Sequence, residues 1–184
     1  TTDGIFVTGG DGESYIRVPC GGEVAEPGTV LVPAKTIAKA VALMEGTVDL
    51  TLDDDDSLGI ETMTSRITLP TAPADSYPRL DWDGDGEKVD FDAWDLLNLV
   101  TYAADGREAR HRSITFFPEG KAEGFGGTRL AYCHAPQGLD FGVLRSTLDF
   151  AARTFGESPV AVSTSHGAAI FSSAGISLWT TLPQ

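Results

Sequence analysis

The chain has 184 residues, 41% of them hydrophobic and 22% charged, and its 27 acidic against 13 basic side chains give a formal net charge of −14. This length provides for one large or two small hydrophobic cores, a mean hydropathy of −0.05 excludes a disordered chain, and no apolar run approaches the ~18 residues of a transmembrane helix. The acidic balance also excludes a protein that holds nucleic acid by bulk charge, because that mode of binding needs a dense basic surface.

The two cysteines and the first residues bear on the setting of the protein. Cys20 and Cys133 lie far apart and not at metal-ligand spacing, which predicts neither a disulfide framework nor a zinc site and favours a reducing, cytoplasmic setting. The chain opens on Thr1-Thr2-Asp3-Gly4, with no methionine or signal peptide, so we expect its N-terminus to be trimmed or to lie outside the sequence.

The first half predicts a hairpin, a helix and a meander. Apolar runs at Ile5–Val7 and Tyr15–Val18 flank the turn Gly9–Gly12, a pattern typical of a β-hairpin. A helix is expected over residues 36–44, because apolar side chains recur at i, i+3, i+4 and i+7, at Ile37, Ala40, Val41 and Met44. Three strand-like runs follow Gly46, at Val48–Leu52, Leu58–Glu61 and Arg66–Leu69.

The second half repeats this order. Residues 70–87 are rich in proline and aspartate and indicate a linker. Beyond them we expect a helix over 93–104 behind a possible cap at Asp92, a second helix over 144–155, and strands at Val89–Phe91, Ser113–Phe117, Arg129–Cys133, Val160–Ser163, Ala168–Phe171 and Ile176–Trp179.

An internal repeat predicts two domains of one kind. Thr68-Leu69-Pro70 and Thr181-Leu182-Pro183 stand 113 residues apart, and each closes a helix-plus-meander unit. Chance occurrence of helix and three strands in an α+β protein is the alternative, but the order within both halves favours a repeat. We therefore expect an α+β fold with helices on one face of antiparallel sheets, in domains 1–80 and 88–184 joined by a linker at 81–87.

Two sequence motifs resemble motifs of the bacterial DNA polymerase III β sliding clamp family. Arg66-Ile67-Thr68-Leu69-Pro70 leads to Ala74-Asp75-Ser76-Tyr77-Pro78-Arg79-Leu80, similar to the phrase that closes the first domain of those clamps, and Gly127-Thr128-Arg129-Leu130-Ala131 is similar to a phrase in their second domain. The chain departs from the family in three ways. A family protomer has three domains, its first domain begins with a further strand, helix and strand, and its Thr-Asp pair and His are replaced here by Phe125-Gly126 and Thr128.

The resemblance implies the DNA clamp fold and a ring that encircles duplex DNA and tethers replication proteins. Rings of this superfamily contain six domains, so two domains per chain imply a homotrimer closed by head-to-tail contacts between edge strands. The implied partners are double-stranded DNA, contacted without sequence preference, and a DNA polymerase and clamp loader bound through short peptides; no cofactor and no membrane are implied. The rival is a clamp-fold regulatory or peptide-binding protein that forms no ring around DNA.

We expect a few separate lysine and arginine side chains to contact DNA. Binding to phosphate without sequence preference needs only a small number of such side chains, even on an acidic protein. The alternative is that single residues of the set are ordinary solvated cations on helix faces. The candidates are Lys35, Lys39, Arg107, Arg110, Arg112, Arg145 and Arg153.

By the resemblance, Gly127, Thr128, Arg129 and Leu130 form one wall of a pocket for a partner peptide. The alternative is that Arg129 and Leu130 simply begin a strand.

Catalysis and metal binding find little support. Asp81-Trp82-Asp83-Gly84-Asp85-Gly86 matches part of a calcium loop, but Lys88 and Asp92 depart from the pattern, which favours a solvated acidic linker. The histidines, His111, His134 and His166, have no serine or cysteine nucleophile elbow beside them, and no Walker or dinucleotide loop is present. We therefore expect that the protein is not an enzyme and has no metal site.

Overall fold

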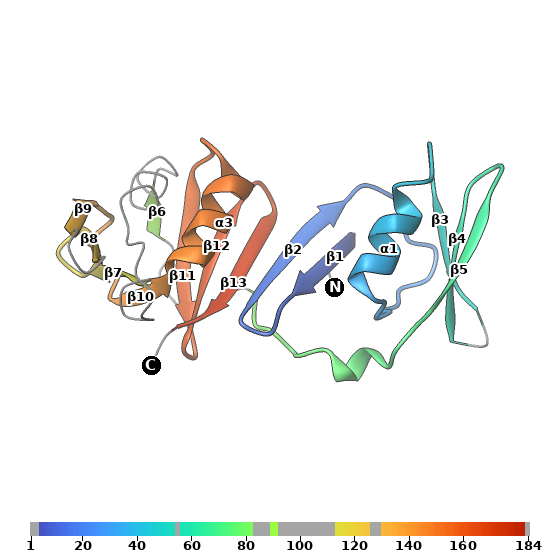
Figure 1. Ribbon diagram of the computed structural model, residues 1–184, viewed down its shortest axis with the longest axis horizontal. Coiled ribbons are helices and arrows are strands. Elements are labelled where there is room, and N and C mark those ends of the chain that lie inside the picture. Colours follow the sequence, from blue (N-terminus) through green and yellow to red (C-terminus); the bar gives the residue numbers. More distant parts are fainter. Residues whose placement is uncertain (1–3, 54–55, 83–88, 92–112, 126–129, 183–184) are drawn as a thin grey trace. The chain divides into compact units, whose positions relative to one another are not determined.

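The computed structural model describes residues 4–53, 56–82, 89–91, 113–125 and 130–182 (Figure 1). Contacts divide the chain into a larger unit of residues 1–22 and 81–184 and a smaller unit of residues 23–80. Every paired strand among the described residues runs antiparallel to its neighbour. Together with the helices described below, this confirms the α+β fold class.

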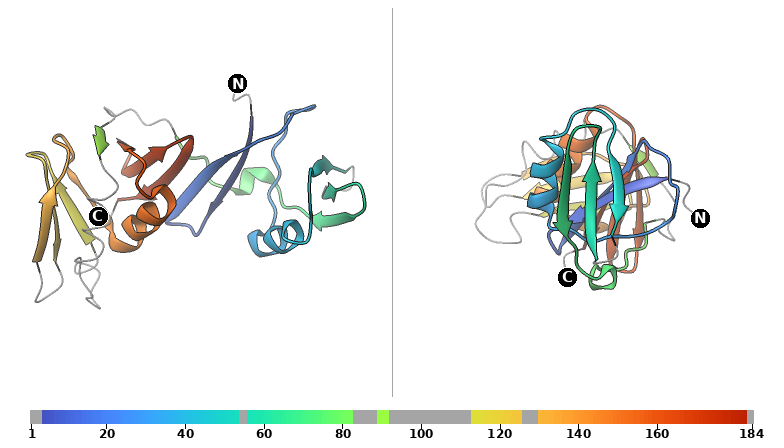
Figure 2. Two further views of the ribbon diagram at one scale, coloured as in Figure 1. Left: turned by 90° about the horizontal axis from the view of Figure 1, so that it is seen from above. Right: turned by 90° about the vertical axis from the view of Figure 1, so that its right-hand side faces the viewer.

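The larger unit contains two sheets and a helix, α3 (Arg145–Phe155). A six-stranded sheet has the order β1-β2-β13-β12-β11-β6, formed by β1 (Ile5–Gly10), β2 (Ser14–Cys20), β13 (Ile176–Thr181), β12 (Ala168–Ser173), β11 (Val160–Ser165) and β6 (Val89–Phe91). A four-stranded sheet has the order β10-β7-β8-β9, formed by β10 (Phe141–Leu144), β7 (Ser113–Phe117), β8 (Lys121–Phe125) and β9 (Leu130–His134). Figures 1 and 2 show α3 lying across the β11–β13 part of the larger sheet.

One core holds these three pieces together. The buried side of α3, with Leu148 and Phe155, packs with Val162 and Phe171 of the six-stranded sheet and with Ile114 of the four-stranded sheet. The helix ends where Gly156 takes a positive φ of 58°, and the N–H of Gly156 donates to the carbonyl of Ala152 at 2.9 Å. Because this conformation suits glycine and disfavours other residues, the sequence stops the helix at the point where the chain must turn into β11.

The smaller unit has one helix on a three-stranded meander. It contains α1 (Ala34–Val41), a 3₁₀ turn at Ala74–Ser76, and a sheet of order β3-β4-β5, formed by β3 (Asp49–Leu52), β4 (Ser57–Glu61) and β5 (Arg66–Pro70). Its core consists of Ala40 from α1 and Leu58, Ile60 and Leu69 from the sheet. The same order of helix and three antiparallel strands recurs as α3, β11, β12 and β13, which confirms the predicted repeat of local structure.

The helix of the smaller unit differs from its prediction. It covers residues 34–41 instead of 36–44, because the Pro33 carbonyl accepts the N–H groups of Thr36 and Ile37 and starts the helix earlier. Val41, one of the four apolar positions on which the predicted helix rests, is 46% exposed and lies outside the core. Ile37 and Met44 do pack against the core, so the narrow meander covers only the line through Ile37, Ala40 and Met44.

Two strands were not predicted. β8 reads Lys-Ala-Glu-Gly-Phe, and its inward positions are Ala122 and Gly124, too small to give a hydrophobic alternation. β10 has only four residues and runs directly into α3, so its apolar residues merge with those of the helix. The predicted helix over 93–104 and residues 83–87 of the predicted linker lie outside the described residues.

The hairpin β1–β2 belongs with the larger unit. β2 pairs with β13, with Tyr15 opposite Trp179 and Ser14 opposite Thr180. The Ser14 and Thr180 hydroxyls lie 3.1 Å apart, and the Tyr15 and Trp179 rings meet edge to face at 5.7 Å. The contacts therefore group residues 1–22 with 81–184, a division different from the expected boundary at residue 80. Within the described residues, no helix has both the length and the apolar character needed to cross a membrane.

We predict that Leu148→Ala lowers the free energy of unfolding by about 2–5 kcal/mol, because Leu148 is fully buried in the core of the larger unit and the substitution leaves a cavity. The matched control is Phe150→Ala on the same helix, where the side chain is 42% exposed and a smaller loss is expected. Urea unfolding followed by circular dichroism measures both. Equal losses from the two variants would contradict this account of the core.

We predict that Gly10→Ala destabilises the hairpin, whereas Gly9→Ala does not. A Cβ at Gly10 would lie 2.1 Å from Tyr15 Cδ1 and 2.7 Å from the Ser14 carbonyl oxygen, while a Cβ at Gly9 would meet nothing within 4 Å. Thermal unfolding of the two variants provides the comparison. Equal melting temperatures for the Gly10→Ala and Gly9→Ala variants would show that the fold does not need the close approach of Tyr15 to Gly10.

Candidate nucleic-acid and partner surfaces

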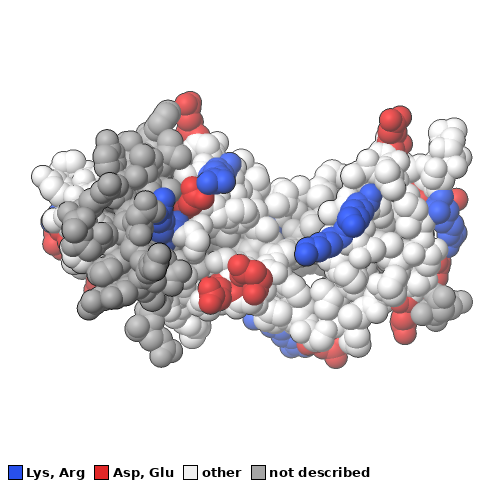
Figure 3. Space-filling view, viewed as in Figure 1, with Lys and Arg blue, Asp and Glu red and all other residues white. Residues whose placement is uncertain are grey.

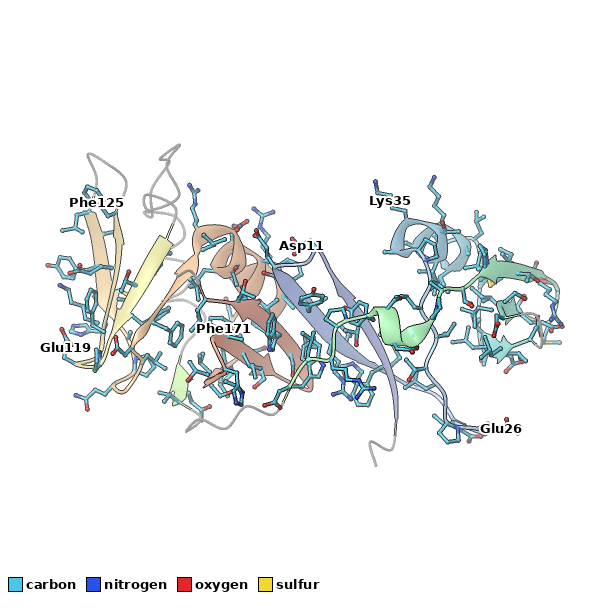
Figure 4. All side chains as sticks on the ribbon, turned by 90° about the horizontal axis from the view of Figure 1, so that it is seen from below. Asp11, Glu26, Lys35, Glu119, Phe125 and Phe171 are labelled. Atoms are coloured by element: carbon cyan, nitrogen blue, oxygen red, sulfur yellow. The ribbon has the colours of Figure 1, made fainter. Side chains whose placement is uncertain are left out.

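The exposed side of α1 presents two lysines. Lys35 and Lys39 are one helical turn apart and exposed, whereas Ala40 on the other side is buried against the meander. No acidic residue occurs within Ala34–Val41, and neither lysine has an ion-pair partner among the described residues. Figure 3 shows lysine or arginine side chains over α1 surrounded by uncharged surface, and Figure 4 shows Lys35 projecting from the outer side of the helix. This side of α1 is therefore a small uncompensated cationic face.

The predicted cations of α3 lie in a different environment. Arg153 is exposed, but its Nη2 is 2.8 Å from Oδ2 of Asp149, one turn earlier on the same helix. Such a pair is worth only about 0.3–0.5 kcal/mol on a surface, yet it neutralises the charge that a phosphate would meet. Arg145, the first residue of α3, is partly buried. The described part of α3 is therefore a weaker candidate for a DNA face than α1.

Only part of the predicted DNA-binding set can be placed. Lys35, Lys39, Arg145 and Arg153 lie on the two described helices. The predicted contacts at Arg107, Arg110 and Arg112 lie outside the described residues.

Of the four residues predicted to line a peptide pocket, one lies in the described part of the chain. Gly127, Thr128 and Arg129 lie outside the described residues, and Leu130 begins β9 with 62% of its surface exposed. Leu130 stands opposite Phe125 in the β8–β9 register, and Phe125 is 46% exposed.

The same face of β9 carries Tyr132, which is 71% exposed and lies below the ammonium of Lys121, 5.2 Å from the ring centroid. Lys121 also donates a hydrogen bond to the carboxylate of Glu123, and this bond raises the pKa of Lys121. The outer side of the β8–β9 hairpin is thus an exposed apolar patch of Phe125, Leu130 and Tyr132. Sequence reasoning named only Leu130 of the three as a binding residue, although the alternation of Leu130 and Tyr132 with Ala131 and Cys133 was a signal of this face.

Arg66 forms ion pairs with acidic residues of the smaller unit, one of them Asp53 directly after β3. The guanidinium contacts both carboxylate oxygens of Asp53, at 2.9 and 3.2 Å, and Glu61 at 3.4 Å. Among the described residues no group of three or more His, Cys, Asp or Glu side chains is placed to hold a metal ion. Most of the calcium-like pattern, residues 83–88 and 92, lies outside the described part of the chain.

One histidine, His166, has a serine beside it, although this serine is not part of a nucleophile elbow. The Ser165 hydroxyl lies 2.9 Å from His166 Nδ1 and donates to Oδ2 of Asp81 at 3.0 Å. Ser165 is 7% exposed, and its proton is directed to the carboxylate. The order of the three groups therefore differs from a catalytic triad, in which the histidine stands between the carboxylate and the serine. This network fastens Asp81 to the end of β11.

Comparison with known proteins identifies the fold and its relatives. The family model for the N-terminal domain of the DNA polymerase III beta subunit matches residues 1–81. The beta sliding clamp of Caulobacter vibrioides is 28% identical over 95 residues, which cover 48% of this chain and 26% of that protein.

Solved clamps superpose on almost the whole chain. The DNA polymerase sliding clamp of Bacillus subtilis has a TM-score of 0.86 at 15% identity over 100% of this chain and 55% of that one. The clamp of Caulobacter crescentus has a TM-score of 0.82 at 24% identity over 99% of this chain and 55% of that one. The chain thus spans about half the length of these clamps. The chain is similar in sequence to bacterial beta sliding clamps and shares the fold of the solved clamps.

Proposed function

We propose that the chain acts as a DNA sliding clamp, a processivity factor that encircles duplex DNA and tethers replication proteins to it. The observation that carries this proposal is the cationic face of Lys35 and Lys39 on a helix without acidic residues, within the part of the chain that matches a clamp domain. A clamp holds DNA by topology, so its contacts to phosphate are weak and sequence-blind. Two uncompensated lysines on an otherwise acidic body fit that requirement.

Ring closure is proposed to use edge strands. Among the described sheets, β5 closes one side of the three-stranded sheet and β9 closes one side of the four-stranded sheet. Inside the larger unit a hairpin strand, β2, pairs with the last strand of a helix-plus-meander unit, β13. β9 and β5 are again a hairpin strand and the last strand of such a unit, which supports a head-to-tail contact between β9 of one chain and β5 of the next. With domains at 1–80 and 88–184, three copies would complete a six-domain ring.

Partner recruitment is proposed to use the β8–β9 hairpin. Phe125, Leu130 and Tyr132 offer exposed apolar surface beside the predicted wall residues Gly127, Thr128 and Arg129. Short peptides from a DNA polymerase or a clamp loader are the proposed ligands, since an apolar surface of this kind suits small and exchangeable contacts. On this proposal the protein has no catalytic activity of its own.

The second candidate function is a regulatory or peptide-binding protein that keeps the clamp fold without encircling DNA. Two observations favour it. The ion pair with Asp149 neutralises the charge of Arg153 on α3. Phe125-Gly126 and Thr128 replace the Thr-Asp pair and the His of the motif in the second domain of the clamps.

We predict that replacing Lys35 and Lys39 together by alanine weakens retention on duplex DNA and lowers the salt dependence of binding by about two units of slope, because two phosphate contacts are lost. Binding to a fluorescent duplex measured across a salt series tests this expectation. Lys121→Ala is the matched control, since Lys121 is already paired with Glu123. A double variant that binds like the control would remove α1 from the DNA interface.

We predict that light scattering on a sizing column gives the mass of three 19.4-kDa chains across a dilution series. The same assembly is expected to stay on circular DNA and to slide off linear DNA with free ends. A monomer at every concentration would contradict the self-sufficient ring and favour the second candidate function.

A further inference from the structure

A groove separate from the β8–β9 hairpin lies within the larger unit. It runs between the tip of the β1–β2 hairpin and the first turns of α3, and the left view of Figure 2 shows the hairpin beside this helix. Its volume is about 390 Å³, and its walls include Gly9, Gly10, Asp11 and Tyr15 from the hairpin and Ser146 and Phe150 from the helix.

The walls of this groove are held by contacts beneath them. The Tyr15 ring lies directly against Gly10, where even a methyl group would not fit, and packs edge to face on Trp179. The Thr180 hydroxyl lies 3.1 Å from the Ser14 hydroxyl and 3.3 Å from that of Thr147, so it links the hairpin to α3. The groove is therefore preorganised, which reduces the entropy lost when a ligand binds.

Phe150 gives the groove its apolar side. It is 42% exposed, although Leu148 and Ala151 on the same helix are fully buried. An exposed aromatic ring beside a cavity is typical of an anchor site for an apolar side chain.

Charge decides which class of ligand fits. Among the described residues that line the groove, Asp11 is the charged one, and none is a lysine or an arginine. Oδ1 of Asp11 accepts the N–H groups of Ser14 at 2.9 Å and Glu13 at 3.0 Å, and these hydrogen bonds lower the pKa of the carboxyl group. Asp11 is therefore ionised at neutral pH, and it points from the hairpin tip labelled in Figure 4. A nucleic-acid phosphate would be repelled here, whereas a lysine or arginine would be attracted.

We propose that this groove binds a short peptide of a partner protein, with an apolar side chain against Phe150 and Tyr15 and a basic side chain toward Asp11. The site is distinct from the proposed DNA face on α1 and from the apolar patch on β8–β9. It would let the protein hold a second partner while the β8–β9 hairpin is occupied.

The test uses two labelled peptides and the full chain. One is Gly-Lys-Leu-Ser-Phe-Lys-Gly and the other has glutamate in place of both lysines. We expect the lysine peptide to shift the amide signals of residues 9–16 and 146–150 in ¹⁵N–¹H spectra, and to bind about threefold to tenfold more tightly than the glutamate peptide. Binding of neither peptide, or shifts confined to residues 121–134, would overturn the proposal.

Three variants separate the roles of the groove residues. Phe150→Ala is expected to weaken the lysine peptide about fivefold or more, because an aromatic anchor is truncated. Asp11→Asn keeps an oxygen for the two backbone N–H groups and is expected to remove the preference for lysine over glutamate. Met63→Ala, at the fully exposed turn between β4 and β5, is the control and is expected to leave both affinities unchanged. A preference for lysine that survives Asp11→Asn would also overturn the proposal.

Discussion

The antiparallel pairing of β2 with β13 is the interaction on which the larger unit depends. It joins a hairpin from the start of the chain to a strand from its end, more than 150 residues apart, with Tyr15 opposite Trp179 and Ser14 opposite Thr180. The backbone hydrogen bonds of the ladder satisfy the edge of the meander, and the hydroxyl contacts through Thr180 extend to α3. The groove beside Phe150 exists because this pairing brings the hairpin tip to the helix.

Charge placement explains how an acidic protein could contact DNA in the way that we propose. A net charge of −14 would repel phosphate if it were spread evenly, but the exposed side of α1 has lysines and no acids. On α3 the same kind of cation is cancelled by Asp149. The two described helices therefore occupy equivalent places in the repeat and differ in surface chemistry. On our proposals, α1 serves DNA and the first turns of α3 serve a peptide.

Much of the fold was predictable because its local patterns are strong. The meanders after both helices were predicted within two or three residues, since each alternates apolar and polar side chains and is bounded by turn residues. β8 was missed because Ala122 and Gly124 carry little hydrophobic signal, and the exposure of Val41 was not predictable because periodicity does not reveal how wide a sheet the helix covers. Of the candidate site, Lys35 and Lys39 were visible in the sequence. The i,i+4 spacing of Asp149 and Arg153 on a predicted helix was also a signal in the sequence, whereas the contact between Lys121 and Tyr132 becomes evident only from side-chain geometry.

The sequence by itself determined the order of helices and strands, the repeat of helix and meander, and the resemblance to the β clamps, because periodicity, turn residues and short phrases are local properties of the chain. The tertiary structure decided which sheet the first hairpin joins, and that Asp11, Tyr15 and Phe150 share one groove. Those outcomes depend on contacts between residues far apart in sequence. Such contacts are set by the packing of a common core, and no local pattern encodes them.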